Sequence, residues 1–529
     1  MIIDKPTMRF FVVLALLVIC SSLIRLFHYA GPMAFDEQKW IIAAQFLLGQ
    51  DVPEIHPVYH SRILWSIILA GWGTLFGWSW TSIEFLVFIL SAGTIIAITL
   101  ATREFFSSRA GLLGGAFYAF HPINIVYDTA AIPDSLAVFL TAISLLFFGR
   151  YLRSFCKREL VFTGLMVGLL FSIKVYYILY AVPLGLIVLF FRTETRRVNE
   201  FLALVVAVLT GLGLSLLLGF FFAEDFLISL SGSSDYAERI RADTVYVGFR
   251  AWIHLILERV DYLNDLLYQY SGAFGLLTLW ITGILAMDMR HSRSAFLFLS
   301  ITIFLLFLMF MPASIHPLIF VETQTRYLTV VLIPLSIGAG YALDRITIEL
   351  QNTHLSGLGL LVFVAALGLN AWDANGRWDR YQLMELSGIQ SALKIAQQED
   401  FTAIAVPKSF VLGVPDMSHD REGTKIELVP FGDPDVDNVL KFLAENPKEH
   451  AAFIPRRHYR AMIKDLRFDS VHNNEVSPDL LEIVSALELA GIERMAITVP
   501  YRSLEARLET VGIKTRGQLV GWLYYHPTD

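Results

Sequence analysis

Long apolar runs occupy much of the first 370 residues and recur at intervals that suit helices crossing a membrane. A helix of about 20 apolar residues spans the roughly 30 Å hydrocarbon core of a bilayer. Runs of this kind lie near residues 10–29, 82–101, 110–126, 135–152, 160–173, 176–192, 200–222, 271–289, 294–311, 327–344 and 356–371. The pattern predicts an α-helical polytopic membrane protein with about 11–13 membrane-spanning helices.

The run at 62–78, "RILWSIILAGWGTLFGW", is apolar but short, and it is rich in glycine and tryptophan. If it crossed the membrane, every later loop would change sides. We interpret it as a helix at the membrane interface, where tryptophan is enriched. The basic residues that then share one side are Lys5, Arg9, Arg103, Arg109, Arg150, Arg153, Lys157, Arg158, Arg192, Arg196, Arg197, Arg290, Arg293 and Arg345. The positive-inside rule makes that side cytoplasmic, so the N-terminus is cytoplasmic and loops 30–81 and 223–270 lie outside.

The pattern changes after Trp372, where charged and polar residues become frequent. Short β-type runs, "FTAIAV", "KIELVPF", "AAFIP" and "MAITVPY", alternate there with the amphipathic helical runs "VDNVLKFLAENP" and "LLEIVSALELAG". We therefore expect a membrane domain at 1–372 and a soluble α/β domain at 373–529. The topology places the second domain outside the cytoplasm.

Composition agrees with a membrane protein, because 55% of the 529 residues are hydrophobic and 17% are charged, against about 25% charged in soluble domains. The net charge of -7, with no basic domain, argues against a nucleic-acid partner. Cys20 and Cys156 are too few for a disulfide framework. The apolar run after Lys5 and Arg9 could be a signal peptide, but no small-residue cleavage site follows it. We interpret it as the first span of a protein of the inner or plasma membrane.

Charged groups of both signs gather on the predicted outer side, and charges near hydrocarbon are costly enough to suggest function. They are Asp36 and Glu37, Asp128 and Asp134, Lys174, Arg326, and the pair His60 and Arg62. A carboxylate can act as a general base, while Lys and Arg bind phosphate. A reaction that joins a hydroxyl to a group leaving from phosphate needs both, and a site at the bilayer surface implies a phosphate carried on a lipid.

Each of these residues also has a purely structural interpretation. Asp36 could cap a helix that begins at Glu37, and Asp134 could cap the fourth span. Asp128 could be a solvated loop residue, and Lys174 could extend its ammonium to the interface. No cluster has strong metal-ligand spacing, and the chain has no Walker loop or HExxH motif. The sequence therefore predicts no particular cofactor and leaves open the binding of a divalent cation at this site.

Four motifs follow one another along the chain: "FDEQKWIIAAQFLLGQDVPEIHP", "YDTAAIPDSLAVFL", "GLMVGLLFSIKVYYILYAVPLGLIVLFF" and "TRYLTVVLIPLSIGAGYAL". In this order they resemble the motifs of GT-C membrane glycosyltransferases that use polyprenyl-phosphate sugars. The similarity is to protein O-mannosyltransferases and to aminoarabinose transferases acting on lipid A. The resemblance implies a GT-C fold over nearly the whole membrane region.

The resemblance also implies roles for individual residues. Asp36 corresponds to the proposed catalytic base and Glu37 to its partner, while Asp134 corresponds to the last acidic residue of the second outer loop. Lys174 stands at the lysine of the third motif. Either Arg62 or Ser61 falls where the aminoarabinose transferases have a Glu-Lys-Pro segment whose lysine contacts the carrier phosphate, and the glutamate and the proline are missing here.

The sequence thus predicts an enzyme that transfers a sugar from polyprenyl phosphate to a lipid, glycan or protein acceptor outside the membrane, with inversion. Asp36 would be the general base, Arg62, Lys174, Arg326 and His60 would bind the donor phosphate, and Asp134 and Asp128 would orient donor or acceptor. One alternative is a lipid-linked oligosaccharide transferase. Another is a transporter, for which charges at the membrane midplane and repeated halves would be expected.

Overall fold

The computed structural model describes residues 5–28, 36–50, 52, 57–191, 194–223, 225, 227–228, 273–310, 312–315, 318–320, 328–349, 392, 395, 401–407, 427–431, 436–446, 449–455, 492–500 and 517–525. The chain forms two compact units, which are described separately. The membrane unit comprises Met1–Phe27 and Ala43–Arg377, and the α/β unit comprises His28–Ile42 and Trp378–Asp529.

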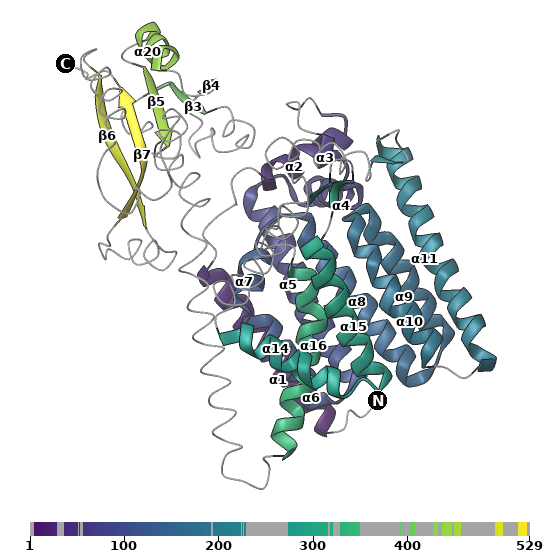
Figure 1. The fold of residues 1–529 in the computed structure, drawn as a ribbon. Helices are drawn as coiled ribbons and strands as arrows, with labels where there is room; N and C mark the ends of the chain where they lie inside the picture. Colours follow the sequence, from purple (N-terminus) through teal and green to yellow (C-terminus); the bar gives the residue numbers. More distant parts are fainter. Residues whose placement is uncertain are drawn as a thin grey trace. The chain divides into compact units, whose positions relative to one another are not determined.

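Helices build the membrane unit, as the ribbon in Figure 1 shows. The first half of its helices are α1 (Lys5–His28), α2 (Asp36–Leu47, which begins in the α/β unit), α3 (Pro57–His60), α4 (Ile63–Phe76), α5 (Trp80–Phe105), α6 (Ser108–Phe120), α7 (Pro122–Tyr127) and α8 (Pro133–Ser154). The second half are α9 (Lys157–Leu169), η1 (Leu170–Ser172), η2 (Val175–Tyr180), α10 (Ala181–Phe190), α11 (Glu194–Ala223), α14 (Ala273–Met287), α15 (Ser292–Phe310) and α16 (Thr329–Glu349).

The helical membrane architecture predicted from the apolar runs is confirmed. Five helices of the described chain are long and apolar enough to cross a membrane: Met8–Leu26, Ser82–Phe105, Pro133–Ser154, Arg197–Ala223 and Thr329–Glu349. Shorter apolar helices lie at Ile63–Phe76, Val175–Phe190 and Ser292–Leu308. The last predicted span, 356–371, lies outside the described residues.

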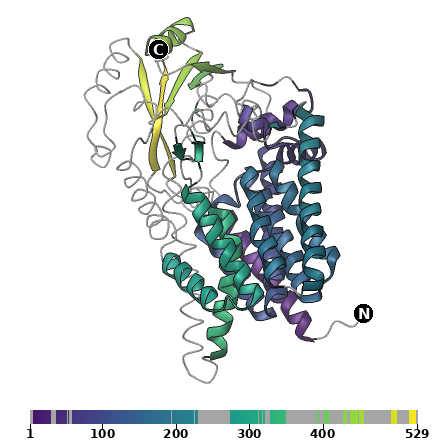
Figure 2. The ribbon, with the colours of Figure 1, turned by 45° about the vertical axis from the view of Figure 1, so that its right-hand side comes forward.

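The run at 62–78 forms the separate short helix α4, which lies with α3 at one end of the bundle (Figures 1 and 2). We call this the α4 end. Gly77 ends α4 with a φ of 85°, a left-handed conformation that glycine adopts readily. Ser79 then caps α5 by accepting a hydrogen bond from the Ser82 backbone, and the Trp72 indole donates to the Ser82 carbonyl at 2.8 Å. These contacts make a tight corner between α4 and α5.

Helix α16 is tied to two interhelical turns at the end of the bundle opposite α4. Asp344 accepts hydrogen bonds from the Ser107 hydroxyl at 2.7 Å and from Arg109, in the turn that leads into α6. The Tyr341 hydroxyl donates to Asp288, between α14 and α15, at 2.8 Å. Both carboxylates thus hold α16 to its neighbours.

The α/β unit contains a mixed five-stranded sheet. Its strands are β3 (Ala403–Pro407), β4 (Glu427–Phe431), β5 (His450–Pro455), β6 (Glu493–Pro500) and β7 (Gly517–Tyr525), in the order β4-β3-β5-β7-β6. β3 pairs in parallel with β4 and β5, whereas β7 pairs antiparallel with β5 and β6. Helix α20 (Val436–Glu445) follows β4 and provides the crossover that parallel strands require.

Strands β3 to β6 and helix α20 were predicted from the sequence, but β7 was missed. β7 is paired on both sides, and such an inner strand carries a weak alternation of polar and apolar residues. The hairpin of β1 (Pro312–Ile315) and β2 (Leu318–Phe320) was also missed. The predicted helix "LLEIVSALELAG" lies outside the described residues.

Glycines bring α9 and α11 into backbone contact. A Cβ atom on Gly211 of α11 would lie 3.0 Å from the Gly168 Cα of α9, and one on Gly164 would lie 2.7 Å from the Ala207 Cβ. Gly213 lies two residues further along α11, and no atom of another described helix lies within 4 Å of the position that an added Cβ would take. Small residues permit such close approach between helices in a membrane.

The Gly211→Ala variant is therefore expected to lower the free energy of unfolding by about 1–3 kcal/mol, the usual effect of overpacking. Gly213→Ala is the matched control in the same helix, and it should leave stability unchanged or raise it by up to about 1 kcal/mol, because alanine favours helix. Thermal unfolding of the detergent-solubilised protein measures both. Equal destabilisation by the two substitutions would contradict the close contact.

Candidate active site

Asp128 is buried in an ion pair with Arg25 of α1, at 2.9 Å between the guanidinium and the carboxylate. The carboxylate also accepts hydrogen bonds from the Tyr118 hydroxyl at 3.0 Å and the Ser91 hydroxyl at 3.3 Å. Arg25 is 1% exposed and donates in addition to Ser21 and to the Ala119 carbonyl. The interpretation of Asp128 as a solvated loop residue is therefore wrong.

Lys174 and Asp134 form a second buried ion pair. Asp134 lies in the first turn of α8 and is 2% exposed, while Lys174 lies between η1 and η2 and is 7% exposed. Ile132 is the N-cap residue of α8, so Asp134 is not the cap. The two alternative interpretations, a capping Asp134 and a Lys174 that reaches the interface, are both wrong.

The position of Asp134 suits its charge. A carboxylate in the first turn of a helix interacts favourably with the positive end of the helix dipole. The Lys174 ammonium also lies 5.7 Å from the centroid of the Tyr176 ring, within cation–π range. Each of these interactions reduces the cost of burying the two charges.

Arg62 and His60 lie at the start of α4. Arg62 is the N-cap residue of α4, and this helix contacts η1, the segment that leads to Lys174. His60 ends α3, and its ring centroid lies 4.8 Å from that of Phe46. Burial lowers the pKa of His60 below its ordinary value of 6.5, which favours the neutral imidazole.

The acidic pair of the first outer loop begins helix α2. Asp36 is the first residue of the helix, and Glu37 is 2% exposed. Both belong to the α/β unit. Arg326 lies outside the described residues.

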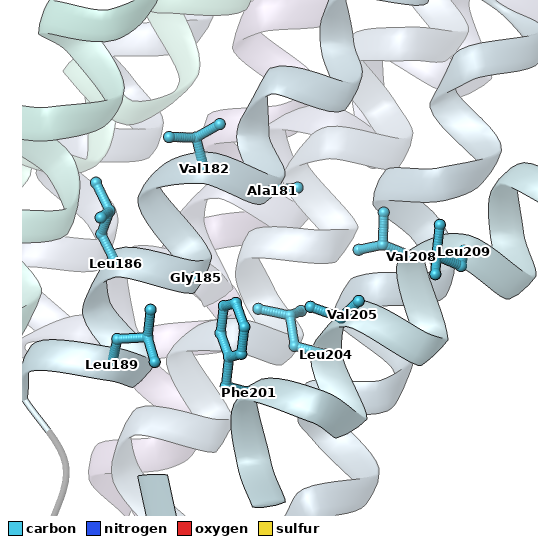
Figure 3. A pocket seen from close by; sticks show the side chains of 10 residues that line it. All are labelled: Ala181, Val182, Gly185, Leu186, Leu189, Phe201, Leu204, Val205, Val208 and Leu209. Atoms are coloured by element: carbon cyan, nitrogen blue, oxygen red, sulfur yellow. The ribbon is translucent and has the colours of Figure 1, made fainter. Parts of the chain in front are cut away.

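A pocket lies between α10 and α11 (Figure 3). No side chain in its lining carries a group that could take part in catalysis. It has a volume of about 340 Å³, and its lining side chains are all apolar, with Val182 and Leu189 from α10 and Phe201 from α11. Among the described residues, no group of three or more His, Cys, Asp or Glu side chains could hold a metal ion.

Residues 56–217 match a protein-family model described as dolichyl-phosphate-mannose-protein mannosyltransferase. The matched segment includes His60, Arg62, Asp128, Asp134 and Lys174. The resemblance to GT-C membrane glycosyltransferases inferred from the motifs is thereby confirmed over this segment. A search of curated proteins gives no match.

Solved structures show weaker likenesses. The ArnT protein of Cupriavidus metallidurans bound to undecaprenyl phosphate is 15% identical, covers 98% of this chain and 99% of its own, and has a TM-score of 0.49. The Archaeoglobus fulgidus oligosaccharyltransferase is 12% identical, with 83% and 68% covered and a TM-score of 0.48. The S. cerevisiae Pmt1-Pmt2 O-mannosyltransferase complex bound to the sugar donor is 18% identical, with 44% and 36% covered and a TM-score of 0.36. All three TM-scores lie below 0.5.

Residues 56–217 thus resemble a family of membrane glycosyltransferases, and the described chain contains several helices long and apolar enough to span a membrane. Among the buried charges of the bundle, Arg25 was not predicted from the sequence, although a signal was available. Arg25 is a charge inside the apolar run 10–29, and such a charge requires a counter-ion.

Breaking the Lys174–Asp134 pair should destabilise the protein, because one buried charge is left alone. Lys174→Met is expected to lower the free energy of unfolding by about 3–5 kcal/mol. The exposed pair of Arg153 and Glu104, at 3.2 Å, offers a control in which the Arg153 side chain is 64% exposed. Arg153→Met should cost no more than about 1 kcal/mol, and thermal unfolding with and without 0.5 M salt compares the two. A Lys174→Met protein as stable as Arg153→Met would contradict the buried pair.

The lowered pKa of His60 predicts that any pH dependence this residue gives to donor binding is centred below pH 6.5. Its unfolded value is about 6.5 and its folded value is lower, so the imidazole takes up its proton at a lower pH than a free histidine does. Above about pH 7 the Michaelis constant for a lipid-phosphate donor should therefore vary with pH in the same way in the natural protein and in His60→Gln. A rise of the constant above about pH 7 that disappears in His60→Gln would show a cationic His60.

Proposed function

We propose that the protein transfers a sugar from a polyprenyl-phosphate donor to an acceptor on the outer side of the membrane, with inversion at the anomeric carbon. The observation that carries the proposal is the buried Lys174–Asp134 pair within the segment that matches the mannosyltransferase family model. A lysine kept charged inside an apolar bundle is suited to bind an anion.

Asp134 holds Lys174 in place for the donor phosphate. An ammonium carries three N–H donors, so a lysine paired with a carboxylate can also contact phosphate oxygens. Arg62, on the helix that contacts η1, adds a second cation. Arg326 is the third proposed phosphate ligand.

Asp36 is the proposed general base, with Glu37 as its partner. Its place at the first residue of α2 favours a carboxylate, because the helix N-terminus carries partial positive charge. Asp36 accepts the proton of the acceptor group as the acceptor atom bonds to the anomeric carbon. The bond from that carbon to the phosphate oxygen breaks at the same time, and the polyprenyl phosphate leaves with the electron pair. Cations stabilise the charge that grows on the phosphate.

The proposed sidedness rests on the distribution of basic residues. Arg103, Arg109, Arg153 and Arg345 lie at helix ends or turns away from α4, at the α5–α6 turn, the end of α8 and the end of α16. Positive residues favour the cytoplasmic side. The α4 end, which includes the segment from Asp128 to Asp134, would then face outward.

The test is transfer of a labelled sugar from polyprenyl phosphate by the purified, full-length protein in the presence of a membrane acceptor fraction. Asp36→Asn should lower kcat by about 10²–10⁴, the usual contribution of a general base, while donor binding is kept. Lys174→Met should instead raise the Michaelis constant for the donor.

The matched carboxylate control is Glu104→Gln. Glu104 pairs with Arg153 and lies at the C-terminal end of α5, away from α4. The substitution should leave transfer unchanged. Normal turnover by Asp36→Asn would exclude Asp36 as the base. If the natural protein neither binds donor nor transfers sugar but moves a substrate across vesicle membranes, it is a transporter and the enzyme proposal is wrong.

A further inference from the structure

Arg25 stands outside the chemistry described so far, yet it is among the most completely buried side chains of the membrane unit. It lies near the C-terminal end of α1 and donates to Ser21, to the Ala119 carbonyl at 2.8 Å and to Asp128 at 2.9 Å. Each partner lies in a different place: the previous turn of α1, the end of α6 and the segment after α7. The three hydrogen bonds therefore fix the orientation of the planar guanidinium as well as the position of its charge.

Asp128 is held from several sides. Its carboxylate accepts from Arg25, from the Tyr118 hydroxyl and from the Ser91 hydroxyl, and its backbone N–H donates to the Asn124 carbonyl at 2.9 Å. These contacts leave the carboxylate one position and orientation. The start of the short segment that follows is thereby fixed.

Segment 128–135 carries that fixed position to Asp134. The Ile132 N–H donates to the Ala130 carbonyl at 2.9 Å, and the Ser135 N–H donates to the Ile132 carbonyl at 3.2 Å. The Ser135 hydroxyl reaches back to the Ala130 carbonyl at 2.9 Å. Only five residues lie between Asp128 and Asp134, and local hydrogen bonds brace them. Displacement of Asp128 would therefore move Asp134. The Lys174 ammonium, which pairs with Asp134, would move with it.

We infer that Arg25 is a positioning residue for glycosyl transfer: through Asp128 it fixes segment 128–135 and so holds the Asp134–Lys174 pair in register with the donor phosphate. This inference rests on the proposed function, in which Lys174 binds that phosphate. Net stability is a poor explanation for such a pair, because buried ion pairs often add little compared with apolar side chains of the same size. A fixed geometry is what three donors from one planar group provide.

The experiment compares Arg25→Lys, which keeps the charge but loses the planar fork, with the double variant Arg25→Met/Asp128→Leu, which removes both charges and refills the space. Three quantities are measured on the purified full-length proteins: thermal stability, amide hydrogen exchange within 128–135 and in α16, and the donor Michaelis constant and kcat. Arg153→Lys, in the exposed pair, is the control and should change none of them.

Arg25→Lys should speed exchange in segment 128–135 but not in α16, and should raise the donor Michaelis constant between about tenfold and a hundredfold, the scale of a small misplacement at a site. The double variant should regain stability without regaining the low Michaelis constant. In the Lys174→Met background, Arg25→Lys should add no further rise, because both changes act on the same contact.

Three results would overturn the inference: unchanged exchange in Arg25→Lys, a double variant that regains donor affinity along with stability, or effects of Arg25→Lys and Lys174→Met that add. Failure of the proposed function gives a different result, in which Lys174→Met leaves the donor Michaelis constant unchanged. In that case faster exchange confined to 128–135 would still support the link from Arg25 to Asp134, and uniform or unchanged exchange would exclude it.

Discussion

A charge buried among apolar helices needs a partner of opposite sign, and this requirement organises the membrane unit. An isolated charged side chain at the centre of a bilayer costs about 2.5–3.5 kcal/mol by insertion measurements. Arg25 and Lys174 each meet an aspartate, and the two aspartates stand at either end of one short segment between α7 and α8. The segment thus joins α1 to the η1–η2 region through charge. The same two ion pairs hold the helices together and support the proposed phosphate site.

Much of the fold follows from local sequence patterns. The apolar runs predict the helices, because a helix in a membrane satisfies its own backbone hydrogen bonds and needs only length and apolar side chains. The short run at 62–78 was correctly set apart as its own helix, since its glycines and tryptophans differ from the other runs. In the second unit, four strands and α20 could be predicted for the same reason: each pattern extends over only a few residues.

The contacts that define the site depend on residues far apart in the chain, and these could not be derived from spacing. Arg25 and Asp128 are separated by 103 positions, and Asp134 and Lys174 by 40. Asp128 has no local feature that marks it as buried, so a loop aspartate was taken to be solvated. Lys174 was singled out as a charge among apolar runs, but only its buried partner Asp134 reveals that it does not extend to the interface. β7 was missed for a related reason, because its place between two strands is set by sheet pairing and not by its own pattern.

Helix α16 is held to its neighbours near both of its ends. Asp344 and Tyr341 join its C-terminal part to the turns before α6 and before α15. The Tyr180 hydroxyl donates to the Val330 carbonyl in its first turn at 2.6 Å. A hinged motion of α16 would therefore require one of these two sets of hydrogen bonds to break.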